Sequence, residues 1–146
     1  MTLRSWQTLA SRTAFRDPRF FRPYVAGAPQ SDLICLRREL HEETGLLIDA
    51  DPPHVWHQEV AAPGHADGYD GVVNDYFLVR TTRFDPRGAL SDDELAAEHI
   101  TGMRWWRHAD IAEYSGTDLF SPRDIATPLA ALIAGAVPAR PVPLAL

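Results

Sequence analysis

The sequence predicts one domain of the α/β or α+β class, because helical and strand-like segments alternate along its 146 residues. Leucines recur at helical spacing between residues 32 and 44, so a helix is expected there. Apolar runs at 55–62 and 74–81 have the length and composition of strands. A chain of this length can bury a core of its own, and no internal repeat divides it.

The expected helix at 32–44 has recognisable end signals. Ser31 can accept a hydrogen bond from a free N–H of the first turn, so it is expected to cap the helix. Gly45 can adopt the left-handed conformation in which helices end. The later elements are expected in this order: loop at 63–71, loop at 85–94, helical turn near 92–98, strand at 102–108, helix at 108–114 and helix at 121–136.

The two ends of the chain carry different signals. Residues 1–30 contain five arginines and one acid, and they lack clean periodicity. Within them, 19–27 can form a strand, which Pro23 would place at a sheet edge. The predicted organisation is a divergent N-terminal segment at 1–30, a domain at 31–142 and an extended, proline-rich tail ending in residues 143–146.

The charge composition restricts the partners of this chain. A formal net charge of −6 disfavours an extended nucleic-acid surface. All 14 basic residues are arginine, so a phosphate would meet arginine, backbone N–H groups or a metal ion rather than lysine. Cys35 is the only cysteine, and no segment resembles a signal peptide or a membrane span. We therefore expect a cytoplasmic protein without a membrane partner.

Three glutamates form a cluster in the expected helix. Glu39, Glu42 and Glu43 stand at i, i+3 and i+4 and therefore share one helical face. Their charges repel, and two of them lie in the last turn, where the helix dipole disfavours anions. A divalent cation reverses both effects, and Mg²⁺ commonly bridges carboxylates to a phosphate. The alternative is an acidic surface that is merely solvated.

The neighbouring residues each suit a separate task. Arg38 can hold a carboxylate, Leu40 can enter the core, and Leu46 can anchor the chain after its turn at Gly45. The segment matches R-E-apolar-x-E-E-x-G-apolar at every specified position. Chance produces such a match on the order of once in ten thousand chains of this length. The match favours a metal site over a solvated surface.

Residues 38–46, RELHEETGL, resemble the second half of the Nudix box, G-x5-E-x7-R-E-U-x-E-E-x-G-U, where U is a bulky aliphatic residue. The resemblance implies an α/β/α sandwich around a mixed sheet. It also implies hydrolysis of a nucleoside diphosphate derivative or similar small diphosphate, with Mg²⁺ or alternatively Mn²⁺. The segments NDYFLVRT and ELAAEHITGMRWW are similar to later parts of the family pattern. Family members often dimerise, which leaves a homodimer open.

The resemblance assigns roles position by position. Glu42 and Glu43 would be metal ligands, and Glu39 would be a further ligand or the base that activates water. Arg38 would orient a carboxylate. Glu98 is the candidate for a late acidic ligand or base, with a solvated loop acid as the alternative.

The first half of the box departs from the family pattern. Gln30 stands where the box has glutamate, and Tyr24 stands where it has glycine. This departure supports an alternative function, a Nudix-fold binding protein with weak or no catalysis.

Other residues offer further chemistry. His54, His57 and Glu59 raise the question of a zinc site, but regular strand alternation places His54 on the opposite face, which favours partly exposed strand histidines. Trp105 and Trp106 are adjacent in the expected strand at 102–108 and should face opposite ways. Candidate phosphate contacts are Arg80, Arg83 and Arg104.

Overall fold

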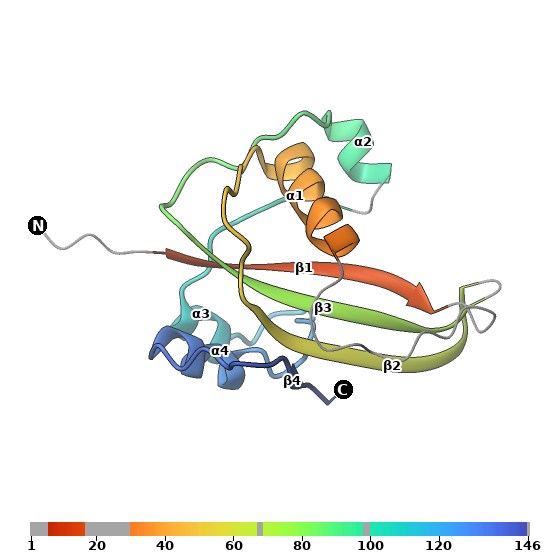
Figure 1. Ribbon diagram of the computed structural model, residues 1–146, viewed down its shortest axis with the longest axis vertical. Coiled ribbons are helices and arrows are strands. Elements are labelled where there is room, and N and C mark those ends of the chain that lie inside the picture. The colour runs from red at the N-terminus through yellow and green to blue at the C-terminus, as the bar shows by residue number, and fades with distance from the viewer. Residues whose placement is uncertain (1–5, 17–29, 67–68, 98–99, 146) are drawn as a thin grey trace, which may run out of the picture.

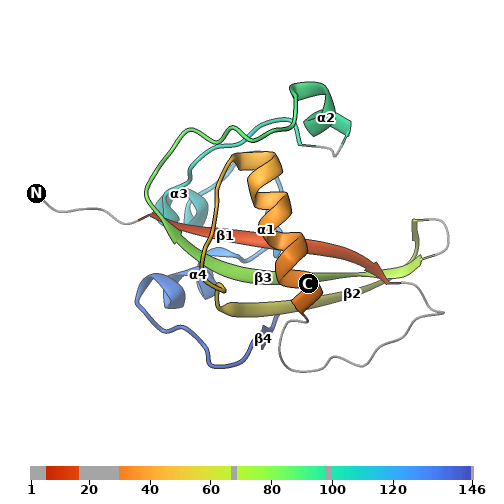
Figure 2. The same cartoon turned by 45° about the horizontal axis from the view of Figure 1, so that its top comes forward.

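A four-stranded sheet lies between two groups of helices (Figure 1). The computed structural model describes residues 6–16, 30–66, 69–97 and 100–145. Helices α1 (Gln30–Thr44) and α2 (Asp92–Ala97) lie on one side of the sheet, and α3 (His108–Ala112) and α4 (Ala126–Ile133) lie on the other (Figure 1). In Figure 2, α1 crosses in front of the strands. The predicted mixture of helices and strands is confirmed.

The sheet is mixed and has the order β1-β3-β2-β4. β1 (Trp6–Arg16) and β2 (His54–Ala66) both pair antiparallel with β3 (Tyr69–Thr81), and β4 (Val142–Pro143) pairs parallel with β2. The sequence had not predicted β1, which falls inside the segment assigned to 1–30. The expected edge strand at 19–27 lies outside the described residues.

One face of β3 carries the core beneath α1. Phe77 and Val79 are two residues apart, so both point to the same side of the sheet. They pack with Leu36 and Leu40 of α1, and all four side chains are buried. The prediction that Leu40 enters the core is confirmed, and Leu46 packs against the same cluster. This core fixes the orientation of α1 and therefore of the glutamates that the helix carries.

Of the two end signals predicted for α1, one is confirmed and one is wrong. The helix begins at Gln30, so Ser31 lies inside the first turn, and the prediction that Ser31 caps it is wrong. Gly45 has a φ of 77°, and its N–H donates to the carbonyl of His41 at 3.0 Å. The predicted left-handed end at Gly45 is confirmed.

The opposite face of the sheet packs against α4 and the C-terminal segment. Its buried apolar residues are Val55, Trp56, Tyr76, Leu78 and Leu132. The buried amide of Gln58 donates to the carbonyl of Ala145 at 3.0 Å, and its oxygen accepts from Asn74 at 3.2 Å. Because β4 pairs with β2 and Ala145 accepts from Gln58, residues 143–145 of the predicted tail contact the sheet.

The predicted strand at 102–108 is wrong. Residues 100–107 contribute no strand to the sheet and are anchored by aromatic side chains instead. The Trp105 indole N–H donates to the carbonyl of Phe84 at 2.7 Å. Trp106 packs edge-on against Tyr114 and Phe120, with ring centroids 5.3 Å apart in both pairs. A pair of aromatic residues favours a strand by propensity, but these contacts replace ladder hydrogen bonds.

Other helices and strands begin or end at residues different from those predicted. β2 and β3 extend into the predicted loop at 63–71, leaving only residues 67–68 between them outside the described part. The helix expected at 121–136 begins at Ala126, where the Asp124 carboxylate accepts from the N–H of Thr127 at 3.4 Å. In the described ranges, no helix combines the length and apolar character that crossing a bilayer demands.

Candidate functional site

The C-terminal half of α1 presents the three predicted glutamates on its surface. Glu39, Glu42 and Glu43 are each partly exposed. The guanidinium of Arg38 lies 3.8 Å from a carboxylate oxygen of Glu42 and 4.0 Å from one of Glu39. Arg38 thus lies near two of the three acids. These contacts are long for ion pairs, so Arg38 restrains the acids loosely.

The donor chemistry of this face fits Mg²⁺, although the three carboxylates do not converge. Mg²⁺ takes oxygen ligands and keeps several waters, so one or two carboxylates are sufficient protein ligands. In the described part of the chain, the three glutamates do not form a group with all ligand atoms within 4.8 Å of one another. A closed three-carboxylate cage is therefore not formed, and one or two of these glutamates would serve as ligands of a hydrated ion.

The loop after β3 closes the C-terminal end of α1. The last carbonyls of a helix lack partners within it. Here the N–H of Arg87 donates to the carbonyl of Thr44, and the N–H of Leu90 donates to that of Glu42, both at 3.0 Å. Gly88 lies between these donors, where an added Cβ would overlap the Glu42 carbonyl oxygen. Only glycine permits the loop to approach so closely.

Gly88→Ala is expected to lower the free energy of unfolding by about 1–3 kcal/mol, because the added methyl group must displace the loop or the helix end. Chemical denaturation of both proteins measures the difference. Gly102→Ala is the control, since a Cβ at Gly102 meets no atom within 4 Å. Equal stability of the Gly88 variant and wild type would contradict the close packing of this loop.

A cavity of about 560 Å³ lies between the end of α1, this loop and α2. Glu43 lines it, together with Asp85, Asp92 and Arg87. Sequence reasoning missed Asp85 and Asp92 because both are separated from the box by about forty residues or more, and no local pattern connects them to it. The cavity gathers three acidic residues from three different elements.

A hydrogen-bonded cap holds the start of α2 beside this cavity. The Glu94 carboxylate accepts from the backbone N–H of Ser91 at 2.8 Å and from its hydroxyl at 2.7 Å. In return, the Ser91 hydroxyl accepts from the N–H of Glu94 at 3.3 Å. Hydrogen bonds from the backbone and side chain of Ser91 lower the pKa of Glu94. This reciprocal arrangement is a capping box, and it positions Asp92.

A second pocket of about 470 Å³ adjoins the first and has a different character. The two share Asp85, Pro86 and Met103 in their walls. The second is also lined by Arg83, Arg104 and Trp105. Arg83 and Arg104 are two of the arginines that the sequence singled out as candidate phosphate contacts. The third, Arg80, lines a different pocket.

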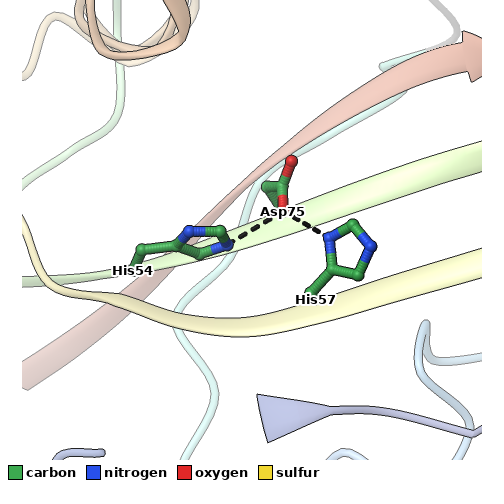
Figure 3. A group of neighbouring side chains, drawn as sticks. All are labelled: His54, His57 and Asp75. Carbon is green, nitrogen blue, oxygen red and sulfur yellow. Dashed lines mark hydrogen bonds and ion pairs between the residues drawn. The ribbon is translucent and has the colours of Figure 1, made fainter. Parts of the chain in front are cut away.

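A separate group of chemistry-bearing side chains lies on the sheet. A carboxylate oxygen of Asp75 on β3 lies 2.9 Å from Nε2 of His54 and 2.7 Å from Nδ1 of His57, both on β2 (Figure 3). The side chain of His54 is 10% exposed, that of His57 is 18% exposed and that of Asp75 is 21% exposed. Their possible metal-ligand atoms all lie within 4.8 Å of one another, and in the described part of the chain no other three such residues lie this close.

A β-bulge explains why the expectation for His54 was wrong. His54 is opposite Phe77, Trp56 is opposite Tyr76, and β2 therefore carries one extra residue between these pairs. The extra residue reverses the alternation, so His54 and His57 share a face instead of pointing apart. The His54 ring stacks on Phe77, with centroids 4.7 Å apart.

The two histidines act on the acidity of Asp75. Burial raises the pKa of the Asp75 carboxyl, but hydrogen bonds from His54 and His57 and their electrostatic interaction with the carboxylate lower it, and the net direction is downward. Asp75 is therefore held as a carboxylate. Nε2 of His54 also lies 3.1 Å from the carbonyl oxygen of Trp56. Both the Trp56 carbonyl and the Asp75 carboxylate are acceptors, so Nε2 donates its N–H toward them.

Some predicted positions lie outside the described structure. Glu98 and Tyr24 are not among the described residues, and of Gln30 only the backbone is described. Comparison of the chain with protein-family models, curated proteins and solved structures gave no significant match.

Proposed function

We propose that this chain hydrolyses a phosphoanhydride bond in a nucleoside diphosphate derivative or similar small diphosphate, as the Nudix resemblance of residues 38–46 implies. The observation that carries the proposal is the position of Glu43. It belongs to the motif, and it lines an acidic cavity that adjoins an arginine-lined pocket. Acidic residues suit a divalent cation, and arginines suit phosphate oxygens.

The sandwich arrangement supports the same proposal. Helices lie on both sides of a mixed sheet, and the motif forms a helix that ends in a sharp turn at Gly45. The Nudix resemblance implies this arrangement. Fold alone does not determine activity, so the proposal rests on the residues of the site.

Each charged residue of the motif would have its own role in the proposed hydrolysis. Glu42 and Glu43 would hold Mg²⁺, which when bound polarises a phosphoryl oxygen and acidifies a nearby water. Glu39 would accept the proton of the attacking water as the new P–O bond forms and the anhydride P–O bond breaks. Arg38 would keep the Glu39 carboxylate oriented, as their 4.0 Å separation permits.

The second pocket would position the rest of the substrate. Arg83 and Arg104 would bind phosphate oxygens, and Trp105 would offer an aromatic surface to a base or sugar. Holding the diphosphate between an acidic and a basic wall would fix the direction of attack. This division also explains why a chain with net negative charge can bind an anionic substrate.

A second candidate function is a binding protein of the same fold with weak or no catalysis. The wide spacing of the three carboxylates favours it, as does the presence of Gln30 and Tyr24 at two box positions. Such a protein would bind a diphosphate without cleaving it.

Phosphate release with Mg²⁺ across nucleotide sugars, dinucleotides and nucleoside triphosphates tests the first proposal. We expect hydrolysis of at least one class, reduced by about 100-fold or more in Glu42→Gln/Glu43→Gln, because several kcal/mol of charge stabilisation are lost. Asp110→Asn/Glu113→Gln changes the charge equally on the exposed surface of the other layer and is the control. Binding of a diphosphate without any release would favour the second candidate. Hydrolysis that is unchanged in the double variant would contradict the proposed site.

A further inference from the structure

The His54–His57–Asp75 group is chemically distinct from the acidic face of α1. It combines two imidazole nitrogens with one carboxylate oxygen, whereas the α1 glutamates offer only oxygen. Imidazole suits zinc and other first-row transition ions, and all-oxygen sites suit magnesium. The two groups would therefore select different ions.

We propose that His54, His57 and Asp75 form a binding site for a divalent transition ion, with zinc the best-fitting member. The proposed ligands are Nε2 of His54, Nδ1 of His57 and one carboxylate oxygen of Asp75. Two histidines and a carboxylate are a common set for zinc when three protein ligands leave one position to water.

The distances suit such a site. Zinc bonds of about 2.0–2.1 Å separate tetrahedral ligand atoms by about 3.3 Å. The oxygen of Asp75 now lies 2.9 and 2.7 Å from the two nitrogens. Side-chain movements of about 0.4 and 0.6 Å would open these two separations to that value.

The site is held in shape before any ion binds. The bulge in β2 brings both rings to one face, and stacking on Phe77 fixes the plane of His54. Pre-positioned ligands reduce the ordering cost of binding. The three side chains remain 10–21% exposed, so solvent can supply the remaining ligand.

The rival account is a hydrogen-bonded trio without a metal. In that account, the two ring N–H groups donate permanently to one carboxylate oxygen. Zinc binding would instead need both nitrogens deprotonated, with each ring proton on its other nitrogen. In the presence of zinc, the ring nitrogens that face Asp75 would therefore keep their protons in the hydrogen-bonded account and lose them in the zinc account.

Zinc titration of the full, chelator-treated chain tests the proposal by calorimetry. We expect one equivalent to bind, with affinity reduced more than about 100-fold in His57→Gln and in Asp75→Asn, since removing a ligand exceeds the usual effect of removing its supporting partner. His41→Gln removes an exposed histidine elsewhere and is the matched control. Glu42→Gln/Glu43→Gln should bind zinc as wild type does, so failure of this proposal is separable from failure of the proposed hydrolase.

A measurement on wild type alone guards against variants that do not fold. Nitrogen chemical shifts of the histidine rings report which nitrogen binds zinc. We expect zinc to shift Nε2 of His54 and Nδ1 of His57. The proposal is overturned if wild type binds no zinc, if folded ligand variants bind it equally well, or if the shifts appear only at other histidines.

Discussion

Replacing Glu39 by glutamine is expected to lower turnover of the proposed hydrolysis by about 10²–10⁴-fold, the usual contribution of a positioned general base. The glutamine keeps the shape of the side chain but cannot take a proton from water. Because Glu39 is partly exposed and shares its helix face with like charges, folding should not weaken. Steady-state kinetics and a thermal melt on the same preparations measure both effects.

Two comparisons make the Glu39 result specific. Glu113→Gln, an exposed acid just beyond α3, should leave both turnover and thermal midpoint unchanged. If Glu39→Gln loses activity and stability together, the acid is structural rather than catalytic. If it keeps full turnover, the attacking water is activated by another group.

Phe77→Ala is expected to lower the free energy of unfolding by about 3–5 kcal/mol, the range for removing a fully buried phenylalanine. Phe77 is 0% exposed and packs against Leu36 and Leu40 of α1. It also stacks on His54. Its loss should therefore loosen the helix that carries the glutamates and the ring that we propose as a zinc ligand.

Equilibrium denaturation measures the effect of Phe77→Ala. Leu119→Ala is the control, because Leu119 is 72% exposed and its truncation should change stability by less than about 0.5 kcal/mol. A Phe77 variant as stable as wild type would mean that α1 is not held by this core.

The elements that were predictable from sequence are those with local signals. The helix at 32–44 was read from leucine spacing and from Gly45, and both are set by neighbouring residues alone. The strands at 55–62 and 74–81 were read from apolar runs that the two sheet faces now explain, since both faces of β3 are buried. Among the described side chains, Leu36 and Leu40 of the helix and Val55 and Trp56 of the first strand are buried as the pattern requires.

The elements that were missed depend on contacts distant in sequence. β1 is held by pairing with β3, about sixty residues away, and its own residues show no clear alternation. Trp105 and Trp106 read as strand residues, but hydrogen bonding to Phe84 and packing with Tyr114 determine their place. Propensity describes a residue alone and carries no information on such partners.

The candidate sites follow the same rule. Glu39, Glu42 and Glu43 could be named because their spacing places them on neighbouring turns of one helix. Asp85 and Asp92 could not, because only the folded chain places them around the cavity with Glu43. The prediction that His54 and His57 point to opposite faces was wrong because β2 carries one extra residue between them. A bulge of one residue reverses the face to which every later side chain of the strand points.

The most direct test of the central claim is the position of a bound metal. Anomalous diffraction from crystals soaked with Mn²⁺ and a non-hydrolysable diphosphate should place an ion within about 2.5 Å of carboxylate oxygens of Glu42 or Glu43, with the diphosphate in the adjoining cavity. Manganese found only beside His54 and His57, or a diphosphate bound away from the end of α1, would contradict the account.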